Sequence, residues 1–156
     1  MQKLNLPSYN FNIRSTENNK TQIFDNLRRK FVSLTPEEWV RQNFIKYLIE
    51  EKNFPQGLIA VEYAIAISNN THRSDIVCFD KKGNARLIVE CKAPSIKITQ
   101  EVFEQAARYN MNLKTDYLIL TNGLSHYCCK VNYATKSVEY LKEIPEFNQL
   151  NSFLSE

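Results

Sequence analysis

Short apolar runs and helix-length segments follow one another along this 156-residue chain, and their order restricts the fold more than any other feature. Four runs are predicted strands because they are apolar and bounded by turn residues, namely residues 58–67, 73–80, 85–93 and 116–123. Residues 99–113 are predicted to form a helix with Thr99 as its N-cap. This helix leaves enough length for a right-handed parallel crossover between the last two strands. The order therefore predicts an α/β fold with a mixed central sheet.

A second helix is predicted ahead of the strands, in the segment TPEEWVRQNFIKYLIEEK. Thr35 stands at the N-cap, Pro36 at the first helical position and Glu38 at the third, which is the pattern of a capping box. Apolar residues at helical spacing give the helix one buried face, at Val40, Phe44, Tyr47 and Leu48. The predicted order is α-β-β-β-α-β. A hairpin of HYCCKVN and SVEYLKE follows, and a short helix from about Pro145 closes the chain.

The first 34 residues are more polar and less regular than the rest. The segments NFNIR and TQIFD flank STENNK, which predicts a small hairpin or arm. We expect this arm, residues 1–34, to pack on a domain formed by residues 35–156. With 43% hydrophobic residues, the whole chain is expected to form one globular domain with a substantial core.

Charge, hydropathy and cysteine content place few limits on function. The formal net charge of +3 permits a polyanionic partner without requiring one. No apolar run approaches the roughly 20 residues that span a membrane, and the start of the chain lacks a signal-peptide core, so a cytoplasmic location is expected. The four cysteines are expected to be reduced and to pack as small apolar residues, with Cys128 and Cys129 on opposite faces of one strand.

Acidic residues occur in two of the predicted strands at positions that face each other. If KKGN (residues 81–84) connects these strands, Asp80 faces Ala85 and Asp75 lies opposite Glu90. Directly opposed side chains have Cβ atoms roughly 4.5–5.5 Å apart, where like charges are destabilising. Two such carboxylates need a shared proton or a cation, and Mg²⁺ favours one or two carboxylates with waters and phosphate oxygens. A divalent-metal site is therefore predicted, provided that the register is not shifted by one residue.

Lys92 adds a positive charge to this predicted site. Because side chains alternate along a strand, Glu90 and Lys92 share a face while Cys91 points to the other. A metal held by Asp75 and Glu90, with the Cys91 backbone carbonyl as a further oxygen ligand, suits phosphodiester hydrolysis. The metal acidifies a bound water and neutralises phosphate charge. The lysine orients that water and stabilises the transition state.

The pattern of Asp75 followed by Glu90-Cys91-Lys92, on an α-β-β-β-α-β scaffold, resembles the PD-(D/E)XK nucleases. The resemblance is closer to the nuclease domain at the N-terminus of type I restriction enzyme R subunits, which also occurs in small stand-alone bacterial proteins. It covers about residues 22–125 and is carried by IFDNLRRKFVSLTPEEWVRQ, RSDIVCFD, IVECKAP, QAARYN and LTNG. One departure is that Ser74 stands where the motif has proline, although many members lack this proline.

This resemblance implies a restriction-endonuclease-like αβββαβ core, with a mixed central sheet flanked by helices. It also implies a Mg²⁺- or Mn²⁺-dependent deoxyribonuclease, acting as an endonuclease or an exonuclease. Asp75, Glu90 and Lys92 are then the catalytic residues. A first-helix glutamate often completes the metal site in this group, so Glu38 is either a metal ligand or only part of the capping box.

Four further residues are candidates for supporting the site or contacting DNA. Glu62 interrupts the first predicted strand, and the loop SNNTH leaves its facing open. Gln105 and Tyr109 share a helix face and resemble the Gln-x-x-x-Tyr signature of some family nucleases, although both could be rim positions. Asn122 follows a central strand, where ligand-binding loops are common, but a simple turn also accounts for it.

A second function class stays open beside the nuclease. It is a catalytically idle nucleic-acid-binding or assembly module on the same scaffold. With only three glycines the chain cannot form a P-loop, so other protein subunits would supply a motor or sequence specificity. A homodimer is also allowed, because family members that cut both strands often pair their active sites. The cluster at residues 28–30 is expected to be solvated rather than a phosphate contact, and no role is assigned to His72 or His126.

Overall fold

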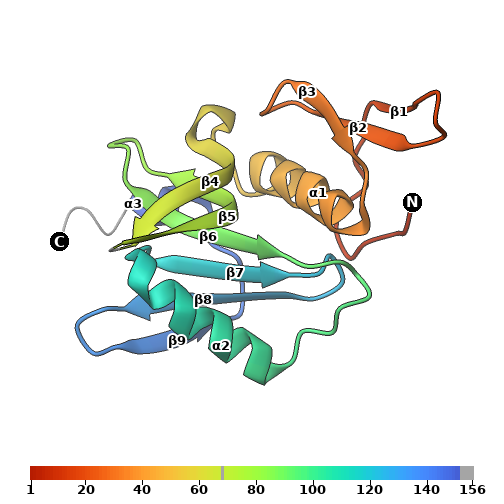
Figure 1. Cartoon of the computed structure of the whole chain (residues 1–156). Helices are drawn as coiled ribbons and strands as arrows, with labels where there is room; N and C mark the ends of the chain where they lie inside the picture. Colours follow the sequence, from red (N-terminus) through yellow and green to blue (C-terminus); the bar gives the residue numbers. More distant parts are fainter. Residues whose placement is uncertain (68, 152–156) are drawn as a thin grey trace.

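The computed structural model, which describes residues 1–67 and 69–151, is built around a six-stranded mixed sheet (Figure 1). The strands follow one another in the sheet in chain order, as β4 (Ile59–Ile67), β5 (Asn70–Phe79), β6 (Ala85–Cys91), β7 (Tyr117–Thr121), β8 (His126–Asn132) and β9 (Ser137–Leu141). Neighbouring strands are antiparallel except β6 and β7, which are parallel. The predicted mixed α/β fold is therefore confirmed.

Two helices pack on opposite faces of this sheet (Figure 1). They are α1 (Pro36–Glu50) and α2 (Gln100–Asn110), the latter continued by the 3-10 turn η2 (Met111–Leu113). Phe44 of α1 and Val89 of β6 belong to one buried core, whereas Phe103 of α2 and Ile88 of β6 belong to the other. Because β6 contributes alternate residues to both cores, most of this strand is covered on both faces.

Both helices begin where the sequence predicts. The Thr35 hydroxyl accepts the Glu38 backbone N–H at 3.0 Å, and the Thr99 hydroxyl accepts the Val102 N–H at 3.2 Å. Each cap satisfies one of the amide groups that a helix leaves unpaired at its start. The α1 cap fixes the first turn of this helix beside the β1–β3 segment.

The turn between β5 and β6 differs from the prediction by one residue, yet the register beyond it is as expected. Phe79 rather than Asp80 pairs with Ala85, and a bulge just before Phe79 takes up the difference. Asp80 instead accepts backbone N–H groups of the turn through its carboxylate. Ile76 pairs with Val89, the pairing that the predicted register requires.

The first part of the chain forms a separate three-stranded antiparallel sheet, one strand more than the predicted hairpin. Its strands are β1 (Ile13–Ser15), β2 (Thr21–Asp25) and β3 (Lys30–Ser33). Residues 1–6, here called the N-terminal strap, run against α1 and the β7–β8 turn. Trp39 donates its indole N–H to the Gln2 carbonyl at 2.8 Å, and the Asn5 N–H donates to the Gly123 carbonyl at 2.8 Å.

The C-terminal part agrees with the sequence in its elements. The β8–β9 hairpin is present, and α3 (Phe147–Asn151) is the short helix expected near the end of the chain. Residues 152–156 of that expected helix lie outside the described part. Another short helix, the 3-10 turn η1 (Gln56–Leu58), precedes β4. All four cysteines are buried and free, and Cys128 and Cys129 belong to different cores, as predicted. Over the described ranges, none of the helices combines the length and apolar composition needed to cross a membrane.

Candidate functional site

Three acidic residues lie side by side on neighbouring strands and are called here the acid row. Continuing the β4–β5 and β5–β6 registers places Glu62 opposite Asp75, and Asp75 opposite Glu90. Glu62 has a left-handed φ of 52° and interrupts the pairing of β4 with β5. This region is uncommon for residues other than glycine and costs on the order of 1–3 kcal/mol, which the surrounding contacts must offset.

Both carboxylate oxygens of Asp75 are engaged by other parts of the fold. Oδ1 accepts from Arg41 Nη2 of α1 at 3.1 Å, and Oδ2 accepts the Cys91 backbone N–H of β6 at 2.7 Å. Asp75 therefore ties α1 and the end of β6 to β5. These charge-assisted bonds hold the carboxylate in one orientation.

Glu90 lies in a less favourable environment for a charge. Burial and, to a smaller extent, repulsion from the Asp75 carboxylate raise the pKa of Glu90 from 4.5 to about 7, although a hydrogen bond from His72 acts in the opposite direction. The His72 Nε2 atom lies 2.9 Å from Glu90 Oε1. Two neighbouring carboxylates thus repel each other at a partly buried position, which is the electrostatic conflict predicted from the register.

A hollow of about 330 Å³ opens beside Glu90, between α2 and β6. Four of the predicted site residues line it, namely Glu90, Lys92, Gln105 and Tyr109. Lys92 is exposed at the end of β6, and its backbone N–H donates to the Thr121 carbonyl at 2.8 Å. The hollow therefore offers a substrate access to a carboxylate and an ammonium group from one side.

Arg41 connects the acid row to α1. Its Nη1 atom lies 3.4 Å from Glu62 Oε1 and 3.6 Å from Glu38 Oε1, in addition to the bond from Nη2 to Asp75. The side chain is buried, and its Nε and Nη1 atoms make no well-aligned hydrogen bond within the described residues. One guanidinium thus neutralises several acids by proximity rather than by paired hydrogen bonds.

Glu38 joins the same cluster. Its carboxylate accepts from Arg28 Nη2 at 2.7 Å and from Gln42 Nε2 at 3.2 Å, while the Thr35 N–H donates to the Ser33 carbonyl. The Thr35 half of the capping box is present, but the Glu38 side chain is directed to Arg28 instead. Arg28 also lies 3.3 Å from Glu62, so the expectation of a solvated cluster at residues 28–30 is wrong for this residue.

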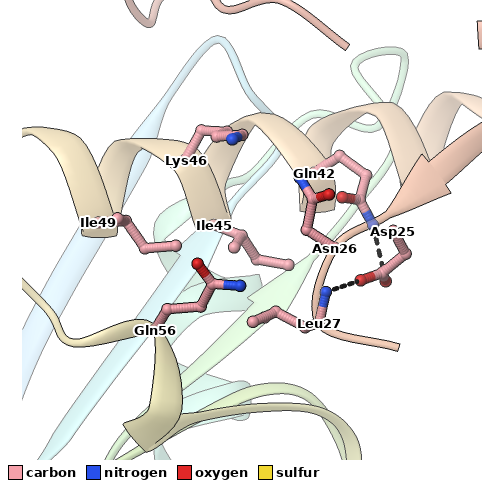
Figure 2. Close-up of a pocket in the computed structure, with 8 residues that line it drawn as sticks. All are labelled: Asp25, Asn26, Leu27, Gln42, Ile45, Lys46, Ile49 and Gln56. Atoms are coloured by element: carbon pink, nitrogen blue, oxygen red, sulfur yellow. Dashed lines mark hydrogen bonds between the residues drawn. The ribbon is translucent and has the colours of Figure 1, made fainter. Parts of the chain in front are cut away.

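Arg28 is held in place by the buried Asp25 at the end of β2. The Asp25 carboxylate accepts the Leu27 N–H at 2.8 Å, Gln42 Nε2 at 2.9 Å and Arg28 Nε at 2.5 Å. Figure 2 shows Asp25, Gln42 and Leu27 around a cavity of about 20 Å³ under α1, with Ile45 among its walls. These bonds lower the pKa of Asp25 despite its burial and couple the β1–β3 sheet to α1.

Asn122 lies in a turn and does not line the hollow. Its Oδ1 accepts the N–H groups of Leu124 and Ser125, and its Nδ2 donates to the Ile96 carbonyl at 2.8 Å. The turn accounts for the hydrogen bonds of Asn122 Oδ1, and the β6–α2 connection accounts for that of Nδ2. A structural role, holding the β6–α2 connection near β7, follows from these contacts.

Three contributors to the site were missed from the sequence, namely His72, Arg28 and Arg41. The β4–β5 hairpin closes between Ile67 and Asn70, and that register would have placed His72 close to the acid row. The loop SNNTH carries no standard two-residue turn signature, so the register was left open. No sequence signal locates Arg28, because its contacts join the β2–β3 turn to α1 and β4.

The donor set fits a hard divalent cation. Asp75 and Glu90 provide neighbouring carboxylates, and burial together with repulsion from Asp75 raises the pKa of Glu90, so a cation beside both would favour their ionised forms. Within residues 1–67 and 69–151, no three side chains of His, Cys, Asp or Glu are grouped so as to hold a metal by themselves. The Cys91 carbonyl, waters or substrate oxygens would therefore have to complete the coordination.

Comparisons with known proteins agree with the architecture. A solved fragment described as an HsdR subunit of a type I restriction enzyme from Vibrio vulnificus YJ016 aligns with a TM-score of 0.54 and 19% identity. The alignment covers 78% of this chain and 25% of that chain, so the present chain spans about a quarter of its length. At this identity the likeness concerns the fold alone. Among curated proteins, no significant match is found.

A family model gives the assignment. The model of the type I restriction enzyme R protein N terminus matches residues 36–145, which is more than half of the chain. The matched range begins with α1 and includes the strands of the six-stranded sheet, so it contains the acid row and the hollow beside it. The chain belongs to the family of type I restriction enzyme R protein N-termini.

Proposed function

We propose that this chain is a Mg²⁺- or Mn²⁺-dependent deoxyribonuclease domain with a restriction-endonuclease-like core. The observation that carries the proposal is the opposition of Asp75 and Glu90 across β5 and β6, beside the exposed Lys92. The raised pKa of Glu90 supports it, because a folded protein seldom keeps two carboxylates together without a use for their charge. The order α1-β4-β5-β6-α2-β7 supports the core.

In the proposed hydrolysis, the residues of the site have different roles. Asp75, Glu90 and the Cys91 carbonyl would hold the cation, which supplies charge neutralisation at phosphate and acidification of a water molecule. Arg41 and the Cys91 N–H orient the Asp75 carboxylate. Lys92 orients the attacking water and stabilises negative charge developing on the phosphate oxygens. Gln105 and Tyr109, on the opposite wall of the hollow, would contact the DNA strand.

DNA is the substrate that the family suggests, and other subunits are its natural partners. The matching family is that of type I restriction enzyme R protein N-termini, and the solved relative is named as a subunit of such an enzyme. We infer that a motor and sequence specificity come from separate protein chains. Cleavage by this chain alone is therefore expected to be weak and largely independent of sequence. A homodimer with paired active sites remains a further proposal.

A binding or assembly module is the second candidate, and a specific observation favours it. Each acid of the site already has a partner within the protein, because Arg41 lies beside Asp75 and Glu62 and His72 hydrogen-bonds Glu90. A scaffold that had lost its metal would be stabilised by such internal pairs. The lysine at the end of β6 would have no evident purpose in that case, which is why the nuclease is preferred.

Metal binding and cleavage together test the proposal. Calorimetry with Mn²⁺ should show binding that is lost in Asp75→Asn, and supercoiled plasmid should be nicked in the presence of Mn²⁺ or Mg²⁺. Asp75→Asn, Glu90→Gln and Lys92→Ala should each abolish nicking, and Lys92→Ala should retain metal binding. Glu17→Gln, which alters an exposed acid in the β1–β2 turn, is the matched control and should behave as the wild type.

The outcomes separate the two functions. Cleavage that persists in all three variants would show a contaminating nuclease and sink the active-site assignment. Absence of Mn²⁺ binding, even with DNA present, would favour the binding module. DNA binding measured by fluorescence anisotropy without metal would then be retained in Asp75→Asn.

A further inference from the structure

We propose that His72 is a positioning residue for Glu90 and that Tyr109 fixes His72 in that role. This inference rests on the proposed metal-dependent function and adds a residue to its site. The imidazole of His72 lies between two partners from different elements, the Glu90 carboxylate of β6 and the Tyr109 hydroxyl of α2. It thereby joins the floor and the wall of the hollow.

The geometry engages both ring nitrogens. Nε2 lies 2.9 Å from Glu90 Oε1, and Nδ1 lies 3.1 Å from the Tyr109 hydroxyl. The two aromatic rings also meet edge to face, with centroids 4.9 Å apart at an interplanar angle of 66°. Three contacts therefore determine both the place and the rotation of the imidazole.

The direction of the bond to Glu90 follows from the chemistry of the partners. When Glu90 is ionised, as it must be to hold a cation, its carboxylate only accepts hydrogen bonds, so Nε2 carries the proton and donates. In the neutral ring, Nδ1 is then the acceptor and takes the hydroxyl proton of Tyr109. The chain Tyr109 to His72 to Glu90 thus has one donor at each step, and the hydroxyl selects the Nε2–H form of the ring.

Such a bond controls how Glu90 presents its oxygens. Because His72 occupies Oε1, rotation of the carboxylate is restricted, and the carboxylate keeps a fixed relation to Asp75. Hydrogen bonds that orient metal ligands in this way typically change metal affinity by about 10- to 100-fold when they are removed. His72 would act through Glu90 and would not itself touch the metal or the phosphate.

The test compares Mn²⁺ affinity across a set of full-length variants. His72→Ala removes the donor and should weaken Mn²⁺ binding about ten-fold or more. His72→Gln restores an N–H donor without an imidazole, so it should recover part of that loss. Tyr109→Phe leaves His72 in place but unfixed, and its loss should lie between wild type and His72→Ala. The matched control is His126→Gln, because His126 bonds Thr121 and Asn5 away from the acid row.

A second measurement reads the geometry without metal. The chain contains two histidines, so nitrogen NMR of the rings can be assigned by comparing wild type with His126→Gln. His72 should carry its proton on Nε2, and Tyr109→Phe should lower the fraction of that form. If His72→Ala does not fold, His72→Gln, Tyr109→Phe and this spectrum still decide the question.

Failure of the inference differs from failure of the proposed function. Wild-type binding of Mn²⁺ with unchanged affinity in His72→Ala would overturn the role of His72 and leave the nuclease proposal intact. A spectrum with the His72 proton on Nδ1 would do the same. A loss in His72→Ala that His72→Gln does not reduce would also overturn it, because it would indicate direct ligation by the ring. If the wild type does not bind Mn²⁺, both the role of His72 and the metal-dependent nuclease proposal are wrong.

Discussion

Arg41 of α1 and Asp75 of β5 form an ion pair with an Nη2–Oδ1 distance of 3.1 Å, and this pair attaches the first helix to the acid row. The same guanidinium lies within 3.6 Å of Glu38 and 3.4 Å of Glu62. Arg41 therefore contributes to neutralising three carboxylates, two of which, Glu38 and Glu62, also contact Arg28. A metal ion at Asp75 would share this neutralising role, so replacing Arg41 tests whether a metal binds beside these acids.

Replacing Arg41 with methionine should destabilise the metal-free protein and increase its stabilisation by metal. Removing one member of a buried ion pair costs about 3–5 kcal/mol, and partial exposure of Asp75 places the expected loss near the lower end. Urea unfolding with and without Mn²⁺ would measure both effects. Arg73→Met, at an exposed position of β5, is the control. Equal stabilisation by Mn²⁺ in Arg41→Met and wild type would contradict a shared neutralising role.

Glu90 should make stability depend on pH in an identifiable direction. Its pKa is raised from 4.5 to about 7, so between these values the folded protein binds a proton that the unfolded chain has released. The stability contributed by this carboxyl is therefore full below its unfolded pKa and is lost as pH rises through about 7. Glutamine does not ionise, so the Glu90→Gln variant should lack this fall in stability with pH. In urea unfolding between about pH 5 and about pH 8, the free energy of unfolding of the variant should increase relative to that of wild type as pH rises.

The control for this measurement is Glu139→Gln, which changes an exposed acid on β9. Its stability should follow wild type at each pH. A constant difference between Glu90→Gln and wild type across the range would mean that Glu90 ionises normally. Because protons and cations compete for the same carboxylate, Mn²⁺ affinity of the wild type should also increase as pH rises through about 7.

Glu38 distinguishes a structural role in α1 from metal ligation. Its carboxylate is bonded to Arg28 and Gln42, so the structure favours a role in holding the β1–β3 sheet against α1. Glu38→Gln keeps an acceptor for Arg28 but loses the charge, which should lower stability by about 1–2 kcal/mol. Mn²⁺ affinity should change by less than about ten-fold, the smallest loss typical of groups that support a metal. A larger loss of affinity at unchanged stability would identify Glu38 as a ligand.

The sequence predicted the framework well because its signals were local. Thr35 and Thr99 cap their helices, and Cys128 and Cys129 enter different cores, as helix-start chemistry and strand alternation require. The expected opposition of Asp75 and Glu90 survived a misplaced turn because a bulge before Phe79 restored the register. These features depend on neighbours within a few residues or within one hairpin.

The parts that the sequence did not predict depend on tertiary contacts. Arg28 reaches Glu38 and Glu62 from the β2–β3 turn, and nothing in RRK indicates that its first residue is partly buried while the other two are exposed. His72 contacts Tyr109 across 37 positions of the chain. The left-handed backbone of Glu62 is likewise imposed by the cluster around it rather than by its own preference.

The last prediction concerns the N-terminal strap at Gly123. Gly123 and Gly83 share a φ of +85°, but a Cβ on Gly123 would lie 2.7 Å from Leu4 Cδ2, whereas a Cβ on Gly83 would meet nothing within 4 Å. Gly83→Ala should therefore cost only backbone strain, about 1 kcal/mol or somewhat more. Gly123→Ala should cost about 1 kcal/mol beyond this, because the buried Leu4 side chain must shift and Val40 Cγ2 lies 3.1 Å from the added Cβ.

The difference between these two alanine variants measures the packing around Gly123, against Leu4 of the strap and Val40 of α1, since the backbone strain is common to both. Gly57→Ala, which has neither a positive φ nor a close neighbour, sets the baseline. Thermal and urea unfolding of the three variants would provide the comparison. If the strap packs as described, shortening the Leu4 side chain in a Leu4→Ala, Gly123→Ala double variant should cost less than the sum of the single changes. Full additivity of the two changes would show that the Leu4 side chain does not contact position 123 in solution, and the strap would then be held to the turn after β7 by the Asn5 N–H bond to the Gly123 carbonyl rather than by Leu4 packing.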